Sequence, residues 1–142
     1  MIKIYDDKYF SECIKILIET YNIPPWYETW TVEIAAKYLL ELIENKRFYG
    51  IVLIESDELI GCAFCHLKTY HNGEELYIDE FFISPDNQRK GYGKLLMSVI
   101  DEYADENAIK SITLLTGKNK PAYEFYKKCG FTHLESLAFM YK

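Results

Sequence analysis

The loop Gln88-Arg89-Lys90-Gly91-Tyr92-Gly93 restricts the folds open to this chain more than any other segment. Residues 75–84 before it are rich in β-branched and aromatic side chains, which predicts a strand. Residues 91–105 carry apolar side chains at three-and-four spacing, which predicts an amphipathic helix. The start of a helix offers unpaired N–H groups and the positive end of the helix dipole. The pattern therefore predicts a pyrophosphate site, with a plain tight turn as the alternative.

The other segments alternate between the same two patterns. We expect further strands at residues 2–5, 48–55, 59–69, 111–116 and 131–141, and further helices at 10–21, 32–45 and 121–129. Thr31 is the expected N-cap of the second helix, and Pro121 stands at the start of the last one. The order βααβββαβαβ indicates an α/β (α+β) fold in which a mixed sheet carries helices on both faces.

Length and composition favour a single domain over residues 1–142, with 49% hydrophobic residues. The net charge of -6 disfavours a nucleic-acid surface, which needs a basic patch, and would attract a cationic small molecule. The N-terminus lacks the pattern of a signal peptide, and no apolar run approaches the roughly 18 residues of a membrane span. We therefore expect a cytoplasmic protein with no membrane partner.

Metal binding and disulfides are not expected. Cys62 and Cys65 have C-x-x-C spacing, but on a strand their sulfurs point to opposite faces, and no second ligand pair follows. Without an export signal, the four cysteines do not indicate a disulfide framework.

The spacing of the loop residues excludes a dinucleotide fingerprint, G-x-G-x-x-G, and a P-loop, G-x-x-x-x-G-K-[ST]. Instead, the segment from Gln88 to Gly93 resembles the Q/R-x-x-G-x-G/A motif of the GCN5-related N-acetyltransferase (GNAT) superfamily. Residues 119–131 are similar to its second signature, in which an Asn precedes a helix and a Phe-Tyr pair precedes Gly-Phe. The order of elements also matches that fold.

The resemblance implies that acetyl-CoA binds where two parallel strands splay apart and that an amine attacks its thioester directly. It implies donor contacts from the strand residues Phe81, Phe82 and Ile83, from the loop residues Gln88, Arg89, Lys90, Gly91, Tyr92, Gly93 and Lys94, and from Asn119 and Tyr126. Tyr126 would also donate a proton to the leaving thiolate, a step for which a phenol is a plausible acid. Packing of the Tyr126 helix face on the sheet is the alternative.

The general base is expected at Asp79, with Glu80 second. Strand alternation puts Asp79 and Glu80 on opposite faces unless a bulge intervenes, so only one carboxylate would face the acetyl group. The position of the base in related histone acetyltransferases falls at Tyr77, which cannot act as a base, so a histone substrate is disfavoured. Asp79 matches an acidic position of several aminoglycoside 6′-N-acetyltransferases, although both carboxylates could simply be solvated.

Trp26, Tyr27 and Trp30 lie in the loop that commonly walls the acceptor site in this superfamily, where they would bind substrate or anchor the loop. We expect a small amine acceptor, aminoglycoside-like or polyamine-like. A protein or peptide N-acetyltransferase and a non-catalytic acyl-CoA-binding module are the alternatives. A homodimer through the final strand, residues 134–141, is a further hypothesis.

Overall fold

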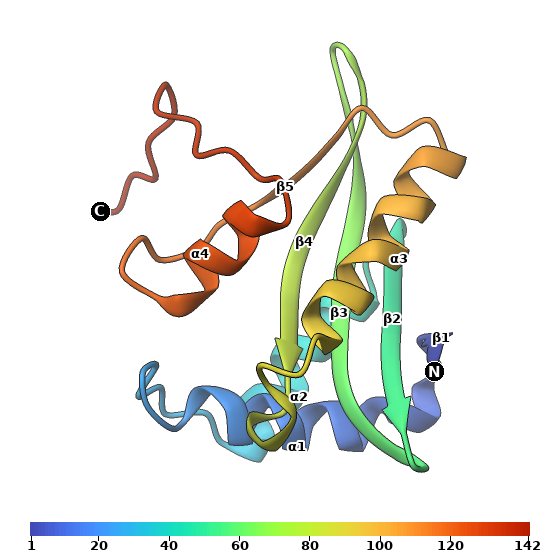
Figure 1. The fold of residues 1–142 in the computed structure, drawn as a ribbon, viewed down its shortest axis with the longest axis vertical. Coiled ribbons are helices and arrows are strands. Elements are labelled where there is room, and N and C mark those ends of the chain that lie inside the picture. Colours follow the sequence, from blue (N-terminus) through green and yellow to red (C-terminus); the bar gives the residue numbers. More distant parts are fainter.

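The computed structural model describes all residues from Met1 to Lys142 and contains one five-stranded sheet (Figure 1). Its strands follow the order of the chain: β1 (Ile2–Ile4), β2 (Phe48–Glu55), β3 (Glu58–Tyr70), β4 (Gly73–Ile83) and β5 (Ser111–Leu114). The first four strands are antiparallel, and β5 pairs with β4 in parallel. The predicted mixed sheet is therefore confirmed.

Helices cover both faces of the sheet, as the sequence predicts. They are α1 (Phe10–Tyr21), α2 (Val32–Ile43), α3 (Tyr92–Glu106) and α4 (Pro121–Lys128). Figure 1 shows α3 on the near face of the sheet and α1 and α2 behind it. Thr31 caps α2, because its side-chain oxygen accepts a hydrogen bond from the Ile34 N–H at 3.2 Å.

Two apolar cores lie on opposite sides of the sheet. Cys62, Phe64 and Phe82 belong to the core beneath α1 and α2, whereas Cys65 and Ile78 belong to the core beneath α3. Cys62 and Cys65 thus point to opposite faces, as strand alternation predicts. All four cysteines of the chain are free thiols.

The pairing of β3 with β4 contains a bulge at Asp79. Phe64 lies opposite Glu80 and Cys65 lies opposite Ile78, which leaves Asp79 as the extra residue of β4. Beyond the bulge the faces are exchanged, so Phe81 packs against the same core as Ile78. Simple alternation along β4, which separates the two carboxylates onto opposite faces, therefore does not hold.

The predicted strand at residues 131–141 is wrong, because this segment has no regular secondary structure. A turn interrupts it, in which the Leu137 N–H donates to the Leu134 carbonyl at 3.2 Å. Its apolar side chains lack a partner: Phe139 is 74% exposed and Tyr141 is 93% exposed. Figure 1 shows this segment running from α4 away from the sheet. Alternating apolar residues form a strand only beside a partner strand, and none lies next to this one.

No helix combines the length and the apolar character needed to cross a membrane.

Candidate active site

A cleft of about 1120 Å³ runs along β4 between the α1–α2 loop, the loop before α3, and α4. Of the residues predicted for the site, it brings together Trp26, Asp79, Glu80, Phe81, Phe82, Ile83, Gln88, Arg89, Gly91, Gly93, Lys94 and Tyr126. It is not lined by Tyr27, Trp30, Lys90, Tyr92 or Asn119. Most of the predicted donor residues thus share one cavity with both predicted carboxylates.

The open edge of β4 forms one wall of the cleft. The pairing with β5 extends only from Glu75 opposite Ser111 to Ile78 opposite Leu114, whereas β4 continues to Ile83. Figure 1 shows the chain after β5 diverging from β4 toward α4. Backbone groups of the last part of β4 therefore have no β5 partner and can bind a ligand that lies along the strand.

The two glycines of the loop before α3 have different structural roles. Gly91 is the N-cap of α3 and has a left-handed backbone with φ of 87°, which favours glycine. Gly93 lies against α4, because a Cβ atom there would come within 2.9 Å of the Phe125 ring. The loop is also held by the Gln88 side chain, whose Nε2 donates to the Ile83 carbonyl at 2.9 Å.

Positive charge gathers at this end of the cleft. Arg89, Lys94 and Lys128 line it beside the N-terminus of α3. Backbone N–H groups at a helix start together with such side chains suit the phosphates of coenzyme A. The open edge of β4 thus fits the pantetheine part of this cofactor, and the basic loop before α3 fits its phosphates.

Tyr126 projects from α4 into the cleft and packs against aromatic neighbours. Its ring meets Phe81 edge-on at 6.1 Å and Phe131 at 5.6 Å between centroids. Burial, and after it the negative charge of Glu80, raises the pKa of Tyr126. The hydroxyl group therefore keeps its proton at neutral pH, as a proton donor must, and the raised pKa also makes it a weaker acid. The packing role and the acid role predicted for this residue are compatible.

Glu80 receives hydrogen bonds from two tyrosines at the other end of the cleft. The Tyr38 hydroxyl donates to Oε1 at 2.6 Å, and the Tyr21 hydroxyl donates to Oε2 at 3.2 Å. Burial raises the pKa of Glu80 from 4.5 to about 7, even though both hydrogen bonds lower it. A carboxylate with such a pKa can accept a proton near neutral pH.

Asp79 is held from behind by His66 of β3. Its Oδ2 lies 2.6 Å from Nδ1 of His66, and the two side chains are 15% and 20% exposed. With Asp79 as a carboxylate, which can only accept, the hydrogen bond is assigned to a proton on Nδ1. Asp79 lines the cleft, and His66 does not.

Three residues of the site were not predicted from the sequence. Tyr21 and Tyr38 occupy apolar stripes of α1 and α2 and resemble core residues, since nothing local shows that their hydroxyls reach β4. His66 pairs with Asp79 only through the bulged register of β3 and β4. A hairpin drawn with that bulge would have indicated the His66 contact.

The aromatic residues of the α1–α2 loop divide between two roles. Trp26 lines the cleft and meets the Tyr21 ring edge-on at 5.4 Å. Trp30 instead packs on the Tyr38 ring at 5.1 Å and donates from Nε1 to Glu28 at 2.7 Å. Tyr27 is 72% exposed. Trp26 thus fits the predicted substrate wall, whereas Trp30 anchors the loop.

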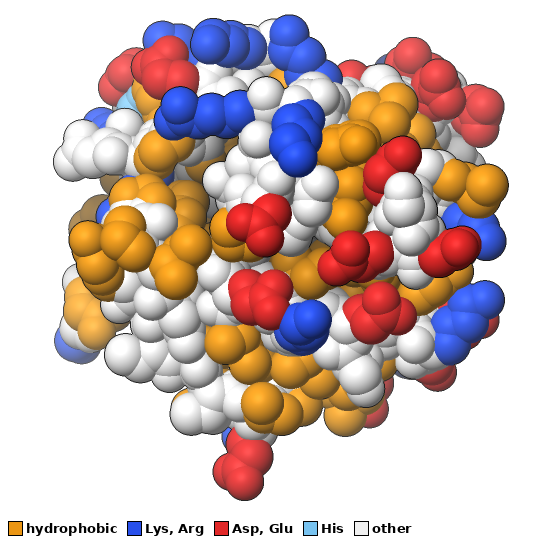
Figure 2. Space-filling model, turned by 60° about the horizontal axis from the view of Figure 1, so that its bottom comes forward, with side chains coloured by type: hydrophobic (Ala, Val, Ile, Leu, Met, Phe, Trp, Pro, Cys, Tyr) orange, Lys and Arg blue, Asp and Glu red, His pale blue; other side chains and the backbone are white.

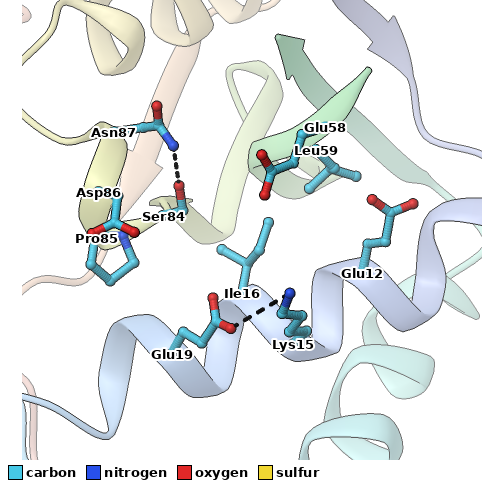
Figure 3. A pocket seen from close by; sticks show the side chains of 10 residues that line it. All are labelled: Glu12, Lys15, Ile16, Glu19, Glu58, Leu59, Ser84, Pro85, Asp86 and Asn87. Atoms are coloured by element: carbon cyan, nitrogen blue, oxygen red, sulfur yellow. Dashed lines mark hydrogen bonds and ion pairs between the residues drawn. The ribbon is translucent and has the colours of Figure 1, made fainter. Parts of the chain in front are cut away.

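A second, smaller hollow of about 410 Å³ lies between α1, the start of β3 and the turn Pro85–Asn87 (Figure 3). Its charged lining consists of surface residues, among them Lys15, which lies 3.8 Å from Glu19. Figure 2 turns the bottom of the Figure 1 view toward the reader. On this face, acidic side chains surround a basic one. No three His, Cys, Asp or Glu side chains are placed to hold a metal ion.

Comparisons with known proteins agree with this geometry. Residues 12–131 match the sequence model of the Acetyltransferase (GNAT) family. The chain is 35% identical over 104 residues to the uncharacterised N-acetyltransferase YhdJ of Bacillus subtilis, covering 70% of this chain and 72% of that protein. It is 30% identical over 100 residues to the uncharacterised N-acetyltransferase MJ1207 of Methanocaldococcus jannaschii, covering 70% of this chain and 44% of that protein.

A relative with a named substrate is similar at lower identity. The [ribosomal protein bS18]-alanine N-acetyltransferase of Haemophilus influenzae is 26% identical over 92 residues, covering 65% of this chain and 60% of that protein. The matched region is thus less than two thirds of the length of two of these three relatives.

Solved structures with the same fold include a possible acetyltransferase from Clostridium difficile 630, with a TM-score of 0.85 at 16% identity, over all of this chain and 96% of that one. They also include the aminoglycoside acetyltransferase meta-AAC0020, from an uncultured soil metagenomic sample, in complex with sisomicin. Its TM-score is 0.77 at 16% identity, over all of this chain and 94% of that one.

Proposed function

Because the chain belongs to the acetyltransferase (GNAT) family, a family of acyltransferases that use acetyl-CoA, we propose that it acetylates a primary amine of a small cationic molecule. One observation carries this proposal: Glu80, a carboxylate with a pKa of about 7, lines the same cleft as Tyr126 and the open edge of β4. A base and an acid thus border the place where an acyl donor would lie.

Residues of β4 and the loop before α3 would hold acetyl-CoA. The edge of β4 from Phe81 to Ile83, which has no β5 partner, would bind its acetyl and pantetheine parts, and the N-terminus of α3 with Arg89 and Lys94 would bind its phosphates. When bound, acetyl-CoA supplies a thioester that an amine can attack. Held at one end of the cleft, the reactants would gain from proximity and orientation.

Two proton transfers fall to residues of this chain. A primary amine is protonated at neutral pH and must lose a proton before it can attack. Glu80 would accept that proton, and its pKa of about 7 favours it over Asp79 for this step. Tyr126 would hold a proton on its hydroxyl oxygen for the leaving sulfur. The prediction of Asp79 as the base is the alternative, which the variants described below distinguish.

The charges at the acceptor end support a cationic substrate. Glu28, Asp79 and Glu80 line the cleft there, and the aromatic rings of Tyr21 and Trp26 form its wall. Carboxylates and aromatic faces both favour ammonium groups. An aminoglycoside-like or polyamine-like acceptor fits these features, and meta-AAC0020 offers a structural parallel.

A protein acceptor is the second candidate. It is favoured by the sequence similarity to the [ribosomal protein bS18]-alanine N-acetyltransferase, whose name gives a protein as the acceptor. The aromatic and acidic lining of the cleft does not by itself separate a free amine from the amino group of a peptide.

The test is the release of thiol from acetyl-CoA across aminoglycosides, polyamines, amino acids and peptides. We expect turnover with cationic small amines and its loss in Glu80→Gln, with Glu41→Gln, an exposed residue of α2, as the matched control. Turnover with peptides alone would favour the protein acceptor. Binding of acetyl-CoA without turnover of any acceptor would favour the non-catalytic alternative.

A further inference from the structure

Two neighbouring carboxylates face the acceptor end of the cleft, although simple alternation would separate them. The bulge at Asp79 lets β4 present Asp79 and Glu80 toward α1 and α2, where each finds a partner on that side of the sheet. Both line the same cavity. A single base does not need two carboxylates, so the second one requires a role of its own.

The partners of the two carboxylates differ in kind. Both oxygens of Glu80 accept from neutral tyrosine hydroxyls. Asp79 accepts at Oδ2 from His66, whose ring also lies 5.4 Å from the ring of Tyr77 at an angle of 50°. His66 therefore fixes the Asp79 carboxylate from outside the cleft, and no hydrogen bond occupies Oδ1.

The bond to His66 fixes one oxygen of the Asp79 carboxylate and so fixes its orientation at the wall of the cleft. A carboxylate held in this way can attract an ammonium group through charge and hydrogen bonding. The charged and titratable groups around this pair are Cys65 of β3, Tyr77 and Glu80 of β4 and Tyr38 of α2, and Glu28 of the α1–α2 loop lies near Glu80.

We propose that Asp79, positioned by His66, binds a second ammonium group of the acceptor, while Glu80 serves the amine that is acetylated. This inference rests on the proposed function and narrows its substrate class to diamines and polyamines. Asp79 is the specificity-determining residue, and His66 is a positioning residue that acts through it.

A matched pair of acceptors tests this division of roles. 1,4-Diaminobutane and n-butylamine share a four-carbon chain and differ by one amino group. For the unaltered protein we expect kcat/KM for the diamine to exceed that for the monoamine by about tenfold or more, the range of one hydrogen bond to a charged group. Asp79→Asn should raise KM for the diamine by a similar factor with kcat little changed, and should remove the preference.

Control variants separate the roles further. Glu80→Gln should lower kcat for both amines, and Asp105→Asn, an exposed residue of α3, should change neither. His66→Phe should reproduce the loss of diamine preference, and His66→Gln, which keeps an N–H donor, should restore part of it. A loss of kcat in Asp79→Asn that is equal for both amines and is reversed at high pH would identify Asp79 as the base and overturn the inference.

Equilibrium binding separates this inference from the proposed function. Calorimetric titration of the protein with 1,4-diaminobutane or n-butylamine, in the presence of coenzyme A, needs no turnover. Tighter binding of the diamine that Asp79→Asn abolishes would support the second ammonium site even if no acetylation occurred. Equal affinity for the two amines would overturn it, whatever the result of the activity assay.

Discussion

Replacing Glu80 with Gln should make the folded protein more stable at alkaline pH while it abolishes the proposed base. The folded state raises the pKa of this carboxyl group from 4.5 to about 7, mainly through burial. A group whose pKa is raised on folding binds its proton more tightly in the folded state. Its favourable contribution to stability is therefore complete at pH below 4.5 and is lost as the pH rises through 7.

The size of this effect follows from the two pKa values. Each pKa unit corresponds to about 1.36 kcal/mol, so ionisation of Glu80 above pH 7 costs the fold about 3 kcal/mol relative to pH 4. Gln is close to the protonated acid in shape and carries no charge. The difference in unfolding free energy between Glu80→Gln and the unaltered protein should therefore rise from near zero at pH 4.5 to at most about 3 kcal/mol at pH 8.

Urea unfolding at pH 4.5, 6 and 8, followed by circular dichroism, measures this difference directly. Glu41→Gln, at an exposed position of α2, controls for the loss of one negative charge from a protein of net charge -6. A Glu80→Gln variant that is less stable than the unaltered protein at pH 8 would refute the reasoning. In that case the two tyrosine hydroxyls, rather than burial, would dominate the energetics of the carboxylate.

Four further outcomes are expected. Tyr38→Phe removes a hydrogen bond that lowers the pKa of Glu80, so the acid limb of the kcat/KM profile should move upward by about one pH unit or more. Tyr126→Phe should lower kcat with little change in the Kd of acetyl-CoA, measured by calorimetry; unchanged turnover would exclude the acid role. Gly93→Ala places a methyl group 2.9 Å from the Phe125 ring and should destabilise the protein by about 1–3 kcal/mol in urea unfolding. Lys120→Met removes the bond from Nζ to the Pro25 carbonyl (2.8 Å) and the contact with the Trp26 ring (5.5 Å). Fluorescence of Trp26 in a Trp30→Phe background should become more accessible to acrylamide, and the acceptor KM should rise.

The elements that frame the proposed donor half of the cleft could be predicted from the sequence, because this half is built from the ends of regular elements. Gly91 marks a left-handed N-cap, and the order of strands and helices places that cap beside β4. Both features follow from the spacing of glycine and apolar residues along the chain, which can be read directly from the sequence. The contact of Gly93 with Phe125 was not predicted, because it joins two helices that are distant in the chain.

The acceptor half could be predicted only in part because it depends on contacts across the sheet. Asp79 and Glu80 both line the cleft, whereas strand alternation predicted only one of them there, and their partners His66, Tyr21 and Tyr38 come from three other elements. The prediction of a final strand was wrong for a related reason. Residues 131–141 have the composition of a strand, but strand formation requires a neighbouring edge, which composition does not reveal.

The bulge at Asp79 determines which side chains of β4 face the acceptor end of the cleft. From the extra residue onward, each side chain of β4 points to the face opposite the one that simple alternation gives. Regular pairing with β3 resumes after the bulge, with Cys62 opposite Phe82, and leads into the loop before α3. Without the bulge, Asp79 and Glu80 would lie on opposite faces and only one could meet an acceptor. The number and position of the carboxylates that meet an amine therefore depend on strand register.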